Sequence, residues 1–236
     1  MTFETEDQKL LTPEQLQKQQ EILAKIEEMY GVVDGFGKHL DGGVIETVAI
    51  LNLMNFNTRA SCEGHLETGL QGPWVQLEAI GRPAGADDRS EEQEKRTWEL
   101  VRQVCDQYGL TIEQLKQKEN GVILQELRDL FEAEPVSKEL EQWREKNKLL
   151  LEQMNKLIAE FEAQSPSSEP NLNIAIEKMG LHSYFRIYCG GEDYINRKDT
   201  TNLSDQEKDN INQKLFKYQA RFKEFSDFLK NKYIQV

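Results

Sequence analysis

The chain has 236 residues, of which 42 are acidic and 29 basic, and its formal net charge is -13 at pH 7. This negative charge repels a phosphate backbone, so we expect no non-specific binding to nucleic acid. The three cysteines, the acidic N-terminal segment and the lack of an apolar run of about 20 residues predict a soluble, cytoplasmic protein with reduced thiols and no membrane partner.

The first part of the sequence predicts two helices. Thr12, with Gln15 three residues later, is typical of a capping box, and apolar positions continue the helix to about Tyr30. Asp41 stands in the N-cap position of a second helix over residues 42–54. That helix is apolar almost all round, which indicates that it is buried on several sides.

Strands are predicted on both sides of a compact turn at residues 61–65. A short strand leads into the turn, and residues 74–80 alternate apolar and polar side chains, which predicts a half-buried strand. A later hairpin, with a turn near Gly180 and a second strand over 183–189, follows the same alternation.

The remaining sequence is mostly charged helix. Residues 87–163 predict a helical insertion, a hairpin or small bundle, and residues 204–233 predict a C-terminal helix. Each carries a coiled-coil-like apolar seam with spacings of four and three, which suits internal packing or a homodimer. The seams are Trp143, Asn147, Leu150, Met154, Leu157 and Phe161, and Ile211, Leu215, Tyr218, Phe222, Phe225 and Leu229.

A few strands joined by long helical connections predict the α+β class. We expect a small antiparallel or mixed sheet packed on helices, in a single domain over residues 1–236, with the helical hairpin as an insertion.

The densest group of reactive side chains is Ser61-Cys62-Glu63-Gly64-His65. A thiol and an imidazole three residues apart suit a nucleophile with its base, two metal ligands, or a packed structural thiol, and all three interpretations are open. We expect Cys62, Glu63 and His65 to be catalytic, with the Glu63 carboxylate suited to general acid-base work. Ser61 and Gly64 are expected to contact a ligand.

A zinc site would need two more ligands. His182 and Cys189 are the candidates, but they are widely spaced and far along the chain from Cys62 and His65. We therefore expect no structural zinc and assign no metal ligand. The sequence leaves the identity of any cofactor open.

Two predicted strands present polar and aromatic side chains on one face. Tyr184, Arg186 and Tyr188 alternate along one strand, and Trp74 and Glu78 share a face of the other. Such a surface suits a planar or anionic small molecule, with Trp74, Glu78, Tyr184 and Arg186 as ligand-binding residues. A cross-strand salt bridge between Arg186 and Glu78 is the alternative.

Several segments resemble a group of uncharacterised bacterial proteins. The main ones are the helix from Asp41 to Asn52, the segment from Thr58 to His65 with its S-C-E-G-H box, and the P-W-V box at residues 73–75. The resemblance extends to residues 149–161 and 185–187. The resemblance implies a shared family and no particular activity. The S-C-E-G-H box is more loosely similar to the S-C-S-G-R segment of the wybutosine-synthesis tRNA methyltransferase family, with His65 in place of the Arg, which implies a nucleic-acid-modifying enzyme.

Taken together, the residues predict a small-molecule-binding protein, or an enzyme of unspecified reaction, with the Cys62–His65 turn as its site. Whether it catalyses a reaction is left open. The alternatives are the nucleic-acid-modifying enzyme and a helical interaction protein without catalysis, in which the two seams bind a partner or a second copy.

Overall fold

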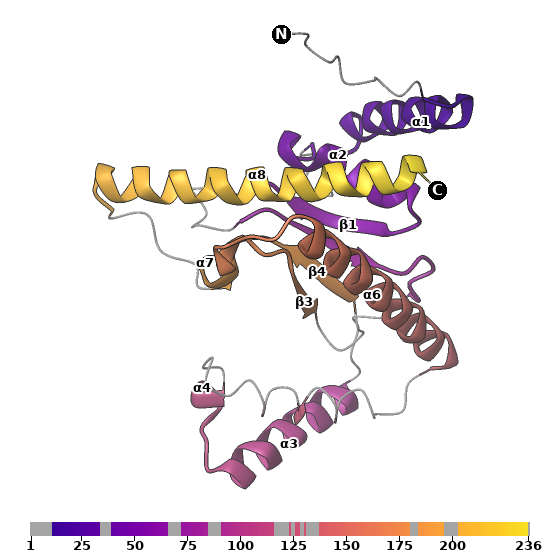
Figure 1. Cartoon of the computed structure of the whole chain (residues 1–236). Coiled ribbons are helices and arrows are strands. Elements are labelled where there is room, and N and C mark those ends of the chain that lie inside the picture. The colour runs from indigo at the N-terminus through magenta and orange to yellow at the C-terminus, as the bar shows by residue number, and fades with distance from the viewer. Residues whose placement is uncertain are drawn as a thin grey trace. The chain divides into compact units, whose positions relative to one another are not determined.

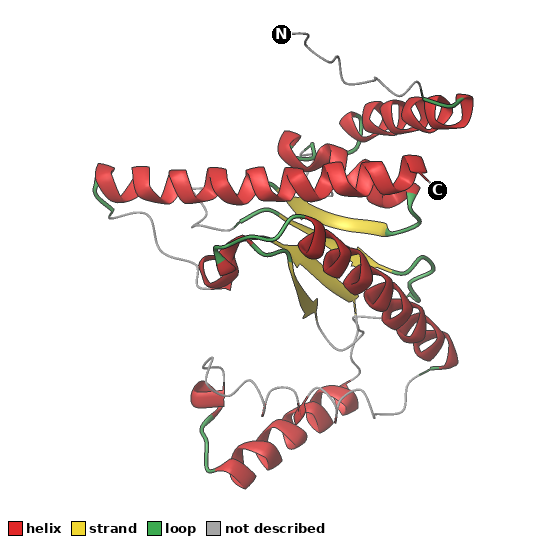
Figure 2. Cartoon of the chain, in the orientation of Figure 1, coloured by secondary structure: helices red, strands yellow, loops and turns green. Residues whose placement is uncertain are grey.

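The computed structural model of the chain describes residues 11–33, 39–65, 72–84, 91–115, 123, 126–127, 130, 137–179, 184–195 and 203–235. Its fold is α+β, as predicted, and Figure 2 shows how far helix predominates over strand. None of the described helices is long and apolar enough to cross a membrane.

The chain divides into two compact units. One comprises residues 1–78, 152–177 and 185–236, and the other comprises residues 79–151 and 178–184. The single domain with an insertion at 87–163 stays a prediction, since parts of that segment lie outside the described residues.

The sheet has four antiparallel strands in the order β1-β2-β4-β3. These are β1 (Asn57–Cys62), β2 (Trp74–Glu78), β3 (Ala175–Met179) and β4 (Tyr184–Tyr188). Because β2 pairs with β1 on one side and β4 on the other, it is a central strand.

The prediction that residues 74–80 form a half-buried strand is wrong in two respects. The strand ends at Glu78 and not at Ile80, whose side chain is 70% exposed. Gln76 and Glu78 are only 7% and 6% exposed, so the polar face of β2 is buried together with the apolar one. The alternation identified the polarity of each face but not what covers it. The polar face is stabilised by partners, since Gln76 accepts a hydrogen bond from Arg186.

Three helices belong to the first unit: α1 (Pro13–Tyr30), α2 (Gly42–Leu53) and α8 (Asp205–Gln235). The predicted capping box at the start of α1 is confirmed, with the Thr12 and Gln15 side chains each accepting a hydrogen bond from the other's backbone N–H. Figure 1 shows α2 between α1 and α8, and it also contacts β1. This position explains why its sequence is apolar all round.

The apolar seam of α8 is buried within the chain, except for the partly exposed Ile211. The C-terminal part of α6 (Lys138–Gln164) meets α8 at Phe161, whose ring centroid lies 5.2 Å from that of Phe225. Met154 and Phe161 of the α6 seam are buried as well. A homodimer through these seams stays a prediction, and their burial gives it no support.

The second unit contains α3 (Glu91–Tyr108), α4 (Ile112–Leu115) and the N-terminal part of α6. Val104 and Leu115 belong to its small apolar core. The polar Asn147 of the predicted seam is fully buried. Its Oδ1 atom accepts a hydrogen bond from the Ala79 N–H at 2.6 Å, which offsets the cost of burying the amide. The Trp143 indole N–H donates to the carbonyl of the same Ala79 at 2.7 Å, so both backbone groups of this residue are satisfied.

Two short helices, η3 (Pro170–Leu172) and α7 (Gly191–Ile195), flank the β3–β4 hairpin. Near them the segment before β2 closely approaches the segment after β4. The Cys189 N–H donates to the carbonyl of Pro73, and a Cβ on Gly72 would lie 1.7 Å from the Cys189 carbonyl oxygen. Only glycine fits at position 72 without moving the backbone.

Candidate functional site

The start of α2 and the end of β1 bring three reactive side chains together. Donor atoms of Asp41, Cys62 and His65 all lie within 4.8 Å of one another, on half-buried side chains. The Asp41 Oδ2 atom lies 2.9 Å from Nε2 of His65. Two of these residues belong to the turn that the sequence indicated, whereas Asp41 was predicted only as a helix cap.

Asp41 occupies the N-cap position of α2, but its side chain makes no capping hydrogen bond. Its carboxylate is directed to the turn, where Oδ2 accepts the N–H of Glu63 at 3.1 Å. Because an N-cap carboxylate ordinarily binds the N–H groups of its own helix, this departure is the feature that sequence reasoning missed.

The turn after β1 is held from two further directions. Gly64 has a φ of 86°, which favours glycine, and its N–H donates to the Cys62 sulfur at 3.3 Å. From α8, the Gln219 side chain donates to the carbonyl of Glu63 at 3.1 Å. The reactive side chains are therefore carried by a well-braced turn.

The Glu63 carboxylate lies at the N-terminus of α2. Its Oε2 atom accepts the N–H of Gly43 at 2.7 Å, one of the N–H groups that a helix leaves without an internal partner. A Cβ on Gly43 would lie 2.7 Å from this oxygen, so the approach depends on the glycine. In this position Glu63 ties the turn to α2, and its predicted catalytic role stays a prediction.

The surroundings of Cys62 disfavour a thiolate. Burial raises the pKa of the Cys62 thiol to about 11, and the Asp41 and Glu63 carboxylates act in the same direction, against the lowering effect of the Gly64 N–H. Nucleophilic cysteines have a lowered pKa. The raised pKa therefore disfavours the nucleophile role of Cys62.

A cavity of about 240 Å³ lies between α1, α2 and β1, and Asp41, Cys62 and His65 are not part of its lining. Its lining includes Leu40 and Ser61, the chain neighbours of Asp41 and Cys62. The Ser61 hydroxyl oxygen is buried, and the described part of the chain offers it no hydrogen-bond partner. Ser61 thus lines the cavity, while its hydroxyl is buried in the wall without a partner among the described residues.

Two of the predicted ligand-binding residues lie together beside the turn. Trp74 is opposite Cys62 in the pairing of β1 with β2, and the Arg186 guanidinium lies over the Trp74 ring, 4.2 Å from its centroid. Arg186 also donates to the Gln76 side chain at 3.4 Å. The cation and the aromatic ring therefore stabilise each other next to the turn.

Glu78 and Tyr184, the other two residues of the predicted polar and aromatic strand face, have different neighbours. Glu78 forms an ion pair with Arg59 at 3.4 Å, and Arg186 is opposite Gln76 in the strand pairing. Each residue of the alternative Arg186–Glu78 salt bridge therefore has a different partner. Tyr184 belongs to the second unit, where its ring centroid lies 6.5 Å from that of Trp143.

The more distant zinc candidates have separate surroundings. Cys189 is fully buried, and its sulfur donates to the carbonyls of Asn171 and Leu172 at 3.8 and 3.5 Å. Burial raises the pKa of its thiol to about 12. His182 lies outside the described residues. Within the ranges that the structure covers, Cys189 behaves as a packed thiol.

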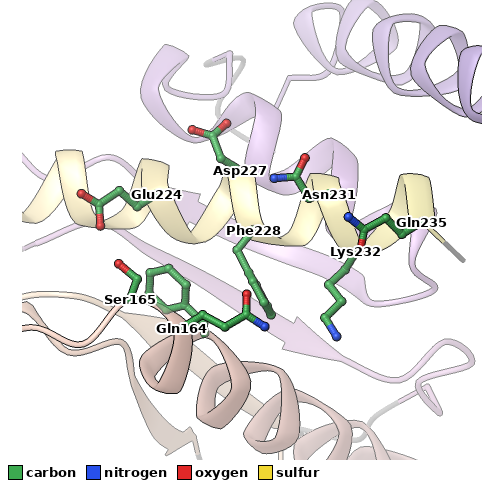
Figure 3. A pocket seen from close by; sticks show the side chains of 9 residues that line it. Gln164, Ser165, Glu224, Asp227, Phe228, Asn231, Lys232 and Gln235 are labelled. Carbon is green, nitrogen blue, oxygen red and sulfur yellow. The ribbon is translucent and has the colours of Figure 1, made fainter. Parts of the chain in front are cut away.

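A second pocket, of about 480 Å³, lies between the end of α6 and α8. Figure 3 shows Phe228 and Lys232 on the side of α8 that faces α6, and Asp227 and Asn231 on the other side. Its lining has neither cysteine nor histidine. Lys232 forms an ion pair with Glu160, so its charge is already balanced. This pocket therefore offers less reactive chemistry than the turn.

Comparison with protein-family models, with curated proteins and with solved structures gives no match. The resemblance to the bacterial S-C-E-G-H proteins, and the looser one to the tRNA methyltransferases, therefore stay expectations. The geometry of the turn is the basis for any functional assignment.

Proposed function

We propose that this protein is a small-molecule-binding protein or an enzyme whose site is the turn from Ser61 to His65, completed by Asp41. The observation that carries the proposal is the convergence of Asp41, Cys62 and His65 within 4.8 Å. A cavity lined by their chain neighbours Leu40 and Ser61 supports it. A thiol, an imidazole and a carboxylate from two separate elements can bind, polarise or exchange protons with a bound molecule.

The cavity limits the size of the ligand. At about 240 Å³ it is smaller than most ligand pockets, which range from about 300 to 1,000 Å³. Apolar side chains such as Met29 and Val48 contribute to its lining. The polar or charged members are Lys25, Asn52, Thr58, Arg59 and Ser61. A compact molecule with an apolar part and polar groups fits this combination.

The cellular setting belongs to the same proposal. All three cysteines are free, which suits a reducing compartment and supports a cytoplasmic location. The interaction-protein alternative draws less support, because the seam residues that would bind a partner are largely buried in the chain itself. The net charge of -13 weighs against a nucleic-acid substrate.

A fragment screen by thermal shift and ligand-observed NMR tests the proposal on the full chain. Compounds that bind wild type should lose binding in Ser61→Leu, which fills the cavity, and bind more weakly in Ser61→Ala, which removes only the hydroxyl. Lys217→Ala, at an exposed ion pair with Glu169, is the matched surface control. Fragments that bind Ser61→Leu as well as wild type would contradict a site at this turn.

A further inference from the structure

The donor atoms at the turn have the composition of a transition-metal site. Asp41 offers a carboxylate oxygen, Cys62 a sulfur and His65 a ring nitrogen. Cysteine, histidine and aspartate are the residue types that bind zinc, whereas magnesium and calcium prefer all-oxygen sites. The mixture therefore favours zinc over the harder cations.

The distances agree with such a site. Zinc bonds of about 2.0 to 2.3 Å place neighbouring ligand atoms of a tetrahedral site about 3.3 to 3.6 Å apart. The donor atoms here lie within 4.8 Å of one another, and the His65 and Asp41 donors are 2.9 Å apart. An ion between them would replace this direct contact and move the two donors slightly apart.

Backbone groups already orient two of the three donors. The Gly64 N–H donates to the Cys62 sulfur, and the Glu63 N–H donates to the Asp41 carboxylate. Hydrogen bonds of this kind fix the direction of metal ligands and are a regular part of metal sites. They also give a reason why Asp41 turns away from α2 at its N-cap position.

Local charge points the same way. A bound dication would be balanced by the Asp41 carboxylate and by the Cys62 thiolate that forms when the thiol releases its proton to solvent. The Glu63 carboxylate adds negative potential, since it is held close by at the N-terminus of α2. The two carboxylates therefore favour a cation at this position.

We propose that Asp41, Cys62 and His65 bind one zinc ion. Three protein ligands leave a coordination position for water or a substrate, as in catalytic zinc sites and unlike closed structural ones. The substrate class, which rests on the function proposed above, is then a small molecule with a carbonyl or phosphoryl oxygen that the ion can polarise. The proposal departs from the sequence expectation of no metal, which considered Cys62 and His65 with the distant His182 and Cys189.

The test is metal titration of the full chain after treatment with a chelator. Co²⁺ serves as the spectroscopic probe, because cobalt bound to a thiolate has a charge-transfer band in the near ultraviolet. Zn²⁺ affinity is then measured by displacement of the cobalt. Wild type should bind one equivalent of Co²⁺ and release it to Zn²⁺.

Matched variants separate the proposed ligands from other residues of the same type. Cys62→Ala should abolish the charge-transfer band, and Cys105→Ala, at a buried cysteine of the second unit, should leave it unchanged. His65→Gln and Asp41→Asn should weaken Zn²⁺ binding at least tenfold, and His39→Gln, at an exposed histidine, should not. Circular dichroism checks that each variant is folded, and Cys62→Ser replaces Cys62→Ala if the latter is not.

Wild type without a thiolate band, or a band that survives in both Cys62 variants, would overturn the zinc site. Equal losses in His65→Gln and His39→Gln would also overturn it. The two proposals can fail separately. If fragments bind at Ser61 but the chain binds no metal, the small-molecule site stands and the zinc site is wrong. If the chain binds one zinc ion but no fragment, the zinc site stands and the proposed function is wrong.

Discussion

Asp41 and His65 are 24 positions apart in the sequence, yet a carboxylate oxygen of one lies 2.9 Å from a ring nitrogen of the other. This contact joins the start of α2 to the end of β1. It adds a donor from a second element to the cluster of reactive residues on the turn, next to the Cys62 thiol.

In chelator-treated protein, Cys62 should react slowly with iodoacetamide at neutral pH. Burial, with the two nearby carboxylates, raises the pKa of its thiol to about 11, so its reaction rate should keep rising well above the ordinary pKa of about 8.5. Asp41→Asn removes one of the carboxylates and should increase the rate at a given pH. Peptide-level mass spectrometry measures the rates, and a midpoint below about 8.5 would instead favour the nucleophile.

Two adjacent glycines at the start of α2 should respond oppositely to alanine. A Cβ at Gly42 has open space around it, so Gly42→Ala should raise the free energy of unfolding by up to about 1 kcal/mol through helix propensity. Gly43→Ala places a methyl group against the Glu63 carboxylate and should lose that gain, together with about 1 kcal/mol for the disturbed hydrogen bond. Urea unfolding measures both, and equal stabilisation by the two variants would show that the Glu63 contact is unimportant.

Removal of the buried Arg221 side chain of α8 should strongly lower the free energy of unfolding. Arg221 is 5% exposed, pairs with Glu162 at 2.8 Å, and its guanidinium lies 4.2 Å from the centroid of the Phe161 ring. Arg221→Met should lower the free energy of unfolding by about 3 kcal/mol, because it leaves a partly buried carboxylate without its cation. The control is Lys217→Met on the same helix, where loss of an exposed pair should cost less than about 1 kcal/mol. Similar losses for the two variants would contradict the assigned difference in burial.

Alkaline pH should destabilise the fold through buried tyrosines. Burial raises the pKa of Tyr194 to about 12, and burial together with a hydrogen bond to Asp193 also raises the pKa of Tyr218. A raised pKa means that the folded state holds the proton more tightly. The stabilisation is therefore complete below about pH 10, the pKa of an unfolded tyrosine, and is lost as pH rises toward the folded-state values.

Tyr218→Phe isolates one of these groups. The variant should show a smaller fall in the free energy of unfolding between about pH 9 and pH 11 than wild type does, since it has one fewer phenol to ionise. Tyr30→Phe, at a side chain that is 59% exposed, is the control and should follow the wild-type curve. A Tyr218→Phe curve parallel to that of wild type would show that ionisation of Tyr218 does not cause the loss of stability.

Features that depend on neighbouring residues were predictable from sequence. The capping box at Thr12 and Gln15 is confirmed because both hydrogen bonds join residues three apart. The all-round apolar pattern of α2 correctly indicated burial on several sides, since no face of that helix could be left in water at low cost. The dense turn at Cys62 and His65 was likewise visible as a local cluster.

Features that depend on distant residues were not predictable. An aspartate at an N-cap position has the same sequence pattern whether it caps its own helix or, like Asp41, turns to another strand. The buried polar face of β2 depends on residues far along the chain, and the alternation of Gln76 and Glu78 with apolar neighbours carries no information about that cover. For Asn147, the seam spacing indicated an inward position, while its partner Ala79 lies 68 residues earlier.

The hydrogen bond from Gln219 to the carbonyl of Glu63 spans 156 residues. During synthesis, the thiol, the imidazole and the carboxylate of the turn leave the ribosome long before the helix that supplies this bond. A nascent chain can therefore fold α2 and β1 against each other while the turn still lacks its last restraint. The bond can form only after α8 has been synthesised, so this restraint of the turn is added last along the chain.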